Sequence, residues 1–255
     1  MIDAIQVSTS ALRAQQQQID LISNNLANMQ TPAFKRARVA FAALSGAPPA
    51  AGEELARGAE PGRGSEMQWL SMVTEQGAIR ATGRPLDVAI DGQGFFEVRG
   101  ADQQLAYTRA GQLSVDAEGF LATVDGARLS ADIAVPPDAS DIEIRPNGEV
   151  VVGFADRVER EVVGQVLLSS FPSAEQMRAS SGNTWLQTTG SGEPVTGVPG
   201  EAGLGALSAG ALEQSNVNVI EEMSNLVMAQ RAYQLNARIL QASDQILETI
   251  NNLRR

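Results

Sequence analysis

The chain has 255 residues, with 19 basic and 30 acidic side chains, no histidine and no cysteine. Its formal charge of −11 disfavours binding to the phosphates of a nucleic acid. Without imidazole or thiol groups it cannot form a Ser-His-Asp triad, a disulfide, or a zinc site with nitrogen or sulfur ligands. The length is enough for one or two domains, and no segment approaches the ~18 apolar residues of a membrane span.

The N-terminal region carries an apolar heptad pattern that predicts a helix. No Gly or Pro precedes Pro32, which disfavours helical geometry at Thr31 and should end the helix there. An isolated helix of this kind is marginal in water, so we expect it to need a partner. The apolar positions are Ile5, Leu12, Ile19, Ile22, Leu26 and Met29.

The next segment changes in composition. Residues 45–66 are rich in Ala, Gly and Pro, which is typical of a linker, and we expect an extended connector over residues 45–85.

The central region, residues 86–188, has the pattern of a β-rich domain. Asp-Gly, Glu-Gly and Asn-Gly pairs recur between short apolar runs, which predicts an antiparallel sandwich or barrel. After the apolar runs of residues 86–98, strands are expected near 104–109, 112–115, 119–124, 141–145, 149–154 and 158–171. A Gly-rich return linker is expected at residues 189–210.

The C-terminal region contains no Gly or Pro after Gly210 and predicts a second helix of about 35 residues. Asn218 can cap this helix, with Glu221 at the matching position of a capping box. Its packing positions are Val219, Leu226, Tyr233, Leu240, Leu247 and Ile250.

Together these patterns predict an α+β fold. Long N- and C-terminal helices are expected to pair as a coiled coil, within a discontinuous helical domain of residues 1–44 and 211–255, around a central antiparallel all-β domain. The charge follows the same division: residues 1–44 carry +2, residues 45–214 carry −13, and residues 215–255 are neutral.

Carboxylate pairs are the chemistry that this composition still allows. A glycosidase needs two of them across a cleft. The candidate groups are Asp87 with Asp91, Asp116 with Glu118, and Asp138 with Asp141 and Glu143. Each group is better explained by a turn or loop, so we predict no catalytic residue, no metal site and no cofactor.

The one local basic cluster, residues 35–38, also has both a functional and a structural interpretation. It could touch anionic lipid and is too short for nucleic-acid specificity, and we expect a solvated loop edge.

Four segments, residues 23–36, 87–96, 107–111 and 215–236, together resemble one family, the bacterial flagellar rod and hook proteins. Residues 23–36 are similar to the family's N-terminal signature, with Ala33 where the family usually has Gly. Residues 87–96 and 107–111 resemble the entry into its β-domain, and residues 215–236 resemble its C-terminal helix. The signature residues are Asn24, Asn25, Leu26, Ala27, Asn28, Thr31, Phe34, Asp87, Gly92, Gly94, Phe95, Phe96, Asn216, Asn218, Arg231 and Tyr233.

The resemblance implies a structural subunit and not an enzyme. Such a subunit would assemble into a helical tube in the basal body, across the periplasm, and transmit torque from motor to hook. It would contact copies of itself, other rod proteins, the hook protein and the surrounding P- and L-ring bushing. Export would use the flagellar type III apparatus, and the N-terminus shows no Sec-type signal.

Two alternatives remain open from the sequence. The chain is most similar to distal-rod members, while residues 84–89 also resemble proximal-rod members. A secreted β-rich carbohydrate-active enzyme or adhesin is the alternative from a different class.

Overall fold

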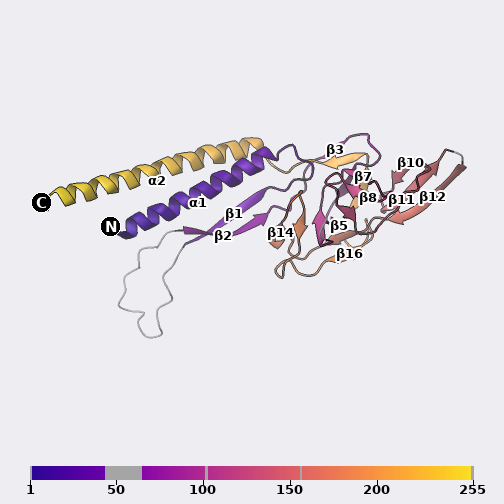
Figure 1. Ribbon diagram of the computed structural model, residues 1–255, viewed down its shortest axis with the longest axis horizontal. Helices are drawn as coiled ribbons and strands as arrows, with labels where there is room; N and C mark the ends of the chain where they lie inside the picture. The colour runs from indigo at the N-terminus through magenta and orange to yellow at the C-terminus, as the bar shows by residue number, and fades with distance from the viewer. Residues whose placement is uncertain (1, 44–64, 101–102, 156, 254–255) are drawn as a thin grey trace, which may run out of the picture. The chain divides into compact units, whose positions relative to one another are not determined.

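The computed structural model describes residues 2–43, 65–100, 103–155 and 157–253 (Figure 1). The chain divides into two compact units. Unit 1 comprises Met1–Ala27, Ala37–Ser71 and Asn218–Arg255. Unit 2 comprises Asn28–Arg36 and Met72–Val217. Both units are therefore built from segments that are far apart in the sequence.

Unit 1 contains the two long helices, α1 (Ile2–Ala27) and α2 (Val219–Leu253), which lie side by side (Figure 1). It also contains β1 (Ala37–Ala43), which pairs with β2 (Ser65–Met72). Residues 45–64 of the expected linker lie outside the described residues.

The start of α2 agrees with the predicted cap. The side-chain oxygen of Asn218 accepts hydrogen bonds from the backbone N–H groups of Ile220 (3.1 Å) and Glu221 (3.4 Å), which would otherwise lack helical partners.

The end of α1 differs from the prediction, because the helix stops at Ala27 and not at Thr31. Asn28 and Thr31 form a turn instead: Thr31 N–H donates to the Asn28 carbonyl (3.1 Å), and the Thr31 hydroxyl donates to the Asn28 side chain (3.2 Å). Short polar side chains compete with helical hydrogen bonds in this way.

Unit 2 is β-rich, and every strand pairing described within it is antiparallel. Its elements are β3 (Ile79–Ala81), β4 (Val88–Asp91), β5 (Phe95–Arg99), β6 (Leu105–Thr108), β7 (Leu113–Val115), β8 (Leu121–Thr123), β9 (Arg128–Leu129), β10 (Ala139–Ile144), β11 (Glu149–Phe154), β12 (Arg157–Gln165), β13 (Leu168–Ser170), the 3-10 turn η1 (Ala174–Gln176), β14 (Arg178–Ala179), β15 (Trp185–Leu186), β16 (Val195–Gly197), β17 (Ala206–Ala209) and β18 (Ala211–Glu213).

The largest sheet has the path β14-β15-β6-β5-β9-β8-β7, with β13 and β16 joined to it through β5. A second sheet has the order β10-β11-β12. The late strands β17 and β18 pair with the early strands β4 and β3, respectively, in two further two-stranded sheets. The core that these strands enclose includes fully buried Phe96, Ile90, Leu121, Val150 and Leu168. The predicted α+β class, with a mainly antiparallel β-rich middle, is confirmed.

Three expected boundaries differ from those of the structure. The expected strand 158–171 is divided into β12 and β13, because Val166 turns into the core while Leu167 stays exposed. Residues 189–210, expected as a linker, contain β16 and β17, since Leu204 and Leu207 are buried in the core. The chain also continues through β18 before α2, whereas the helical domain was expected to begin at residue 211.

Candidate functional site

One residue of the N-terminal signature, Asn25, binds the backbone of another segment within unit 1. Asn25 is 1% exposed. Its amide nitrogen donates to the Ala37 carbonyl (3.1 Å), and its side-chain oxygen accepts from the Ala37 N–H (3.1 Å). The amide also lies 3.4 Å from the Glu222 carboxylate of α2. Asn25 therefore pairs with both backbone polar groups of Ala37 at the start of β1 and also contacts the Glu222 carboxylate of α2.

The turn that follows α1 places Ala33 in the left-handed region, with φ of 56°. This is the position at which the resembling family usually has Gly, the residue that adopts such a conformation without steric cost. Ala33 is 2% exposed, and its N–H donates to the Glu213 carbonyl (2.8 Å). The turn thus directs the following residues toward β18.

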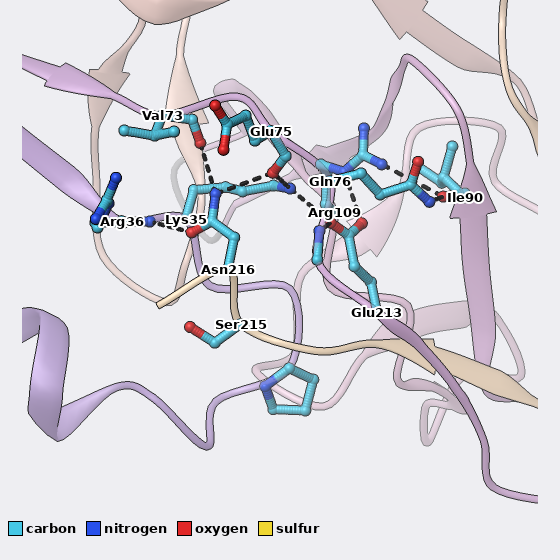
Figure 2. A network of polar contacts seen from close by, with 12 residues as sticks. Lys35, Arg36, Val73, Glu75, Gln76, Ile90, Arg109, Glu213, Ser215 and Asn216 are labelled. Carbon is cyan, nitrogen blue, oxygen red and sulfur yellow. Dashed lines mark hydrogen bonds and ion pairs between the residues drawn. The ribbon is translucent and has the colours of Figure 1, made fainter. Parts of the chain in front are cut away.

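A buried ionic cluster of Lys35, Arg109 and Glu213 lies in unit 2 (Figure 2). The Lys35 ammonium donates to one carboxylate oxygen of Glu213 at 2.5 Å, and the Arg109 guanidinium donates to the other at 2.8 Å. The side chains of Lys35, Arg109 and Glu213 are 1%, 5% and 0% exposed. Buried charges of this kind persist only when they are paired and hydrogen-bonded.

Arg109 extends the cluster into the turn between β4 and β5. Its guanidinium donates to the carbonyls of Gly94 (2.8 Å), Gly92 (2.9 Å) and Ile90 (3.3 Å). Gly92 and Gly94 have φ values of 120° and 134°, which L side chains rarely adopt. The glycines of the β-domain motif therefore present their carbonyls to a buried cation.

Asn216 joins three chain segments beside this cluster (Figure 2). Its side-chain oxygen accepts from the Arg36 N–H (2.7 Å), and its amide donates to the carbonyls of Val73 (3.0 Å) and Glu75 (2.9 Å). The Lys35 ammonium donates to the same Glu75 carbonyl at 2.6 Å. Asn216 thus binds the segment that precedes β1 in the sequence and the segment that follows β2.

The electrostatics of the cluster are dominated by burial. Burial lowers the pKa of Lys35 below its ordinary value of 10.5, and the nearby positive charge of Arg109 lowers it further. Glu213 acts in the opposite direction, through its charge and its hydrogen bond. The arrangement therefore keeps two cations and one carboxylate together out of water.

Lys35, Arg109 and Glu213 were absent from the predicted site residues. The expectation of a solvated loop edge at residues 35–38 is wrong for Lys35, which is almost fully buried. A useful signal was present, because Lys35 is the only lysine and Glu213 follows the apolar pair Ala211 and Leu212 in a strand-like run. The sequence alone could not reveal that Lys35 and Glu213, which are 178 positions apart, form an ion pair.

The predicted packing positions of the helices are distributed unevenly. Ile22 is buried, at 4% exposure, and Tyr233 is 38% exposed. Leu12, Ile19, Leu26, Met29, Val219, Leu226 and Leu240 are half-buried. The side chains of Ile5, Leu247 and Ile250 lie outside the described residues.

The other signature residues fall into three groups by burial. Asp87, Gly94, Phe95 and Phe96 are buried, and Leu26, Asn28, Thr31, Phe34, Gly92 and Asn216 are half-buried. Asn24, Ala27, Asn218, Arg231 and Tyr233 are exposed.

The candidate catalytic carboxylates occupy structural positions. Asp116 accepts the backbone N–H groups of Glu118 (2.8 Å) and Phe120 (2.9 Å) in a turn, and these bonds lower its pKa. Arg128 pairs with Asp116 (2.6 Å) and with Glu118 (2.7 Å).

Three of the other candidate carboxylates are also engaged. Buried Asp87 accepts the Thr82 hydroxyl at 2.7 Å, and Arg160 pairs with both Asp141 and Glu143. Among the described residues, no group of three or more acidic side chains is placed to hold a metal ion, and no helix is long and apolar enough to cross a membrane.

Three protein-family models match the chain. The model described as flagella basal body rod protein matches residues 5–35. The flagellar hook protein FlgE/F/G D1 domain matches residues 89–152, and the flagellar basal body rod FlgEFG protein C-terminal model matches residues 208–253. The matches thus cover α1, the strands from β4 to β11, and α2.

Full-length relatives give the same result. The flagellar basal-body rod proteins FlgG of Agrobacterium fabrum, Caulobacter vibrioides and Borreliella burgdorferi are each 34% identical to this chain. The alignments cover 97%, 99% and 100% of the chain, and 98%, 100% and 100% of those relatives. The flagellar hook protein FlgE of Salmonella typhimurium is 39% identical over 47% of the chain, but over only 29% of its own length. The chain therefore belongs to the flagellar basal-body rod protein family, and within it to the FlgG type.

Proposed function

We propose that this chain is a structural subunit of the distal flagellar rod, which polymerises into a helical tube that transmits torque from motor to hook. The FlgG-type relatives support this role over the full length of the chain, and they support a non-enzymatic protein. The structural observation that carries the proposal is an apolar surface on α2 that α1 does not cover.

This uncovered surface runs along most of α2. Met228, Leu235, Ile239 and Ile246 are 59%, 59%, 54% and 54% exposed. With 3.6 residues per turn, these four side chains fall within a sector of about 40° and form one stripe along the helix. An exposed apolar stripe of this length indicates an interaction surface.

A different face of α2 is already occupied within unit 1. Ala229 is 3% exposed and Glu222, which lies near Asn25 of α1, is likewise 3% exposed. This face lies about 100° around the helix from the apolar stripe. One helix therefore has separate faces for a partner within the chain and for a partner outside it.

The N-terminal part of α2 adds a third apolar group. Ile220, Met223 and Val227 are 82%, 54% and 47% exposed. Several apolar faces on one helix suit a tube in which each subunit touches more than one neighbour. Head-to-tail contacts of this heterologous kind do not close, so they allow a filament to grow.

Within this polymer, α1 and α2 form a coiled coil in the inner layer. Helices whose apolar faces lack a partner are marginal in water, so they gain most of their order on assembly. The charge of −13 carried by residues 45–214 limits lateral association of finished tubes. The subunit joins other rod proteins and the hook protein, passes through the P- and L-ring bushing, crosses the periplasm, and reaches its place by type III export.

The test is polymerisation of purified chain, followed by electron microscopy. Wild-type chain is expected to form tubes of constant diameter, and Ile239→Asp is expected to abolish them while leaving the folded monomer intact. Gln241→Asp is the matched control, because it places the same charge at an exposed polar position on another face of α2. Normal tubes from Ile239→Asp would contradict the role of the stripe.

A further inference from the structure

The buried ionic cluster joins the two ends of the chain within unit 2. Lys35 lies in Asn28–Arg36, the N-terminal segment of the unit, and Glu213 lies in its last strand, β18. They are 178 positions apart, and nearly the whole β-rich sequence lies between them. Arg109, the third member, comes from the middle of that sequence.

Glu213 depends entirely on protein donors. One carboxylate oxygen accepts from the Lys35 ammonium (2.5 Å) and the Gly77 N–H (2.9 Å), and the other accepts from Arg109 (2.8 Å). The side chain is 0% exposed, so water cannot replace a donor that is missing. A buried carboxylate that loses one of its partners keeps the full cost of its desolvation.

The cations depend equally on Glu213. Arg109 lowers the pKa of Lys35 because the two positive charges lie close together, and Glu213 is the nearest negative charge between them. Without Glu213, closing this part of unit 2 would bury two like charges without a counter-ion. The cluster is therefore stable only when all three segments are present.

Gly77 shows how closely the strands approach at this point. A Cβ atom on Gly77 would lie 1.9 Å from the Gln214 carbonyl oxygen, so β18 and the segment before β3 pack there backbone to backbone. This close packing places the Gly77 N–H where it donates to the Glu213 carboxylate.

We propose that Lys35, Arg109 and Glu213 form a latch that lets unit 2 close only when both ends of the chain are in place. Synthesis delivers Lys35 early and Glu213 late, so an incomplete chain retains two unpaired cations and stays open. If the chain polymerises as proposed above, the latch keeps incomplete subunits out of the tube.

Hydrogen exchange measured by mass spectrometry on the full-length monomer tests the latch directly. Lys35→Met is expected to raise exchange roughly a hundredfold or more in residues 211–217, which are distant in sequence from the substitution. Glu213→Gln is expected to raise exchange in residues 33–36 in return. Together, the two substitutions are expected to have less effect than the product of their separate effects, since each breaks the same interaction.

The matched control is Arg99→Met, which breaks an ion pair with Asp132 (2.8 Å) whose side chains are 43% and 49% exposed. It is expected to change exchange in residues 211–217 by less than about fivefold. An effect of Lys35→Met confined to residues 33–36, or independent effects of the two cluster substitutions, would overturn the latch.

If Lys35→Met fails to fold at all, a second variant, Lys35→Arg, tests the proposal. Lys35→Arg keeps the positive charge and is then expected to restore protection of residues 211–217, and its failure to do so would contradict the proposal. These measurements use the monomer, so they stand whether or not the chain forms tubes. Failure of wild-type chain to form tubes would contradict only the proposed function.

Discussion

Asn25 binds both backbone polar groups of Ala37: its amide donates to the Ala37 carbonyl at 3.1 Å, and its oxygen accepts the Ala37 N–H at 3.1 Å. This pairing fixes the end of α1 to the start of β1 within unit 1. An amide side chain supplies the donor and the acceptor of such a pairing on two separate atoms, whereas a carboxylate supplies acceptors only.

Asn25→Asp is therefore expected to destabilise unit 1 by about 1–3 kcal/mol. The carboxylate can no longer donate to the Ala37 carbonyl, and it adds a negative charge beside Glu222. The measurement is the free energy of urea unfolding of the assembled polymer, followed by circular dichroism, because the helices of unit 1 are expected to be ordered there. Asn24→Asp, on the exposed neighbour, is the control, and an equal loss in both variants would count against the pairing.

Ala33→Gly is expected to stabilise unit 2 by up to about 1 kcal/mol, because Gly adopts a φ of 56° without the steric cost that Ala incurs there. Chemical denaturation of Ala33→Gly and of the wild-type chain measures the difference. Destabilisation by Ala33→Gly would show that its buried methyl group outweighs the backbone strain.

Leu26→Asp and Leu240→Asp are each expected to abolish polymer formation while unit 2 remains folded. Both side chains are half-buried on the helices of unit 1, so a charge there opposes helix packing. Electron microscopy scores the tubes. Fluorescence of Trp185, a buried residue of unit 2, reports the folding of that unit when the second tryptophan is removed by Trp69→Phe. Normal tubes from either variant would refute the assignment of that residue to helix packing.

Circular dichroism separates two states of the helices. The signal is expected to show low helicity in dispersed monomer and high helicity in the polymer, because the helices gain their packing partners only on assembly. High helicity in well-dispersed monomer would contradict ordering on assembly.

Tyr107 is expected to make stability fall at alkaline pH. Burial, followed by the negative charge of Glu97, raises the pKa of Tyr107 above 10.0 in the folded protein. The folded state therefore holds this proton longer than the unfolded state does, and the stabilisation is lost as pH rises from 10.0 through the raised value.

Ultraviolet titration of tyrosinate measures the raised pKa of Tyr107 directly. Tyr107→Phe is expected to remove the high-pH step of the titration, whereas Tyr233→Phe is expected to retain it. A step that survives in Tyr107→Phe would mean that another group causes it.

Local patterns in the sequence were sufficient to predict several elements of the fold. The spacing of apolar residues, the absence of Gly and Pro, and the Asn218 cap were enough to locate α2, because a helix is specified by neighbours along the chain. The Gly-containing turn between β4 and β5 was equally visible, since Gly92 and Gly94 are needed for its backbone conformation. The end of α1 was placed too late, because the turn at Asn28 forms through side-chain hydrogen bonds that propensity does not reveal.

The sequence by itself determined the α+β class, the two long helices, the antiparallel middle and the family. Only the tertiary structure decided that Lys35, Arg109 and Glu213 meet, and that β16, β17 and β18 complete unit 2. The physical reason is range: helices and turns follow from interactions among near neighbours, whereas the burial of a charge depends on whether its counter-ion arrives from a distant part of the chain. The single lysine looked like a solvated charge in the sequence, and the carboxylate that buries it lies 178 residues away.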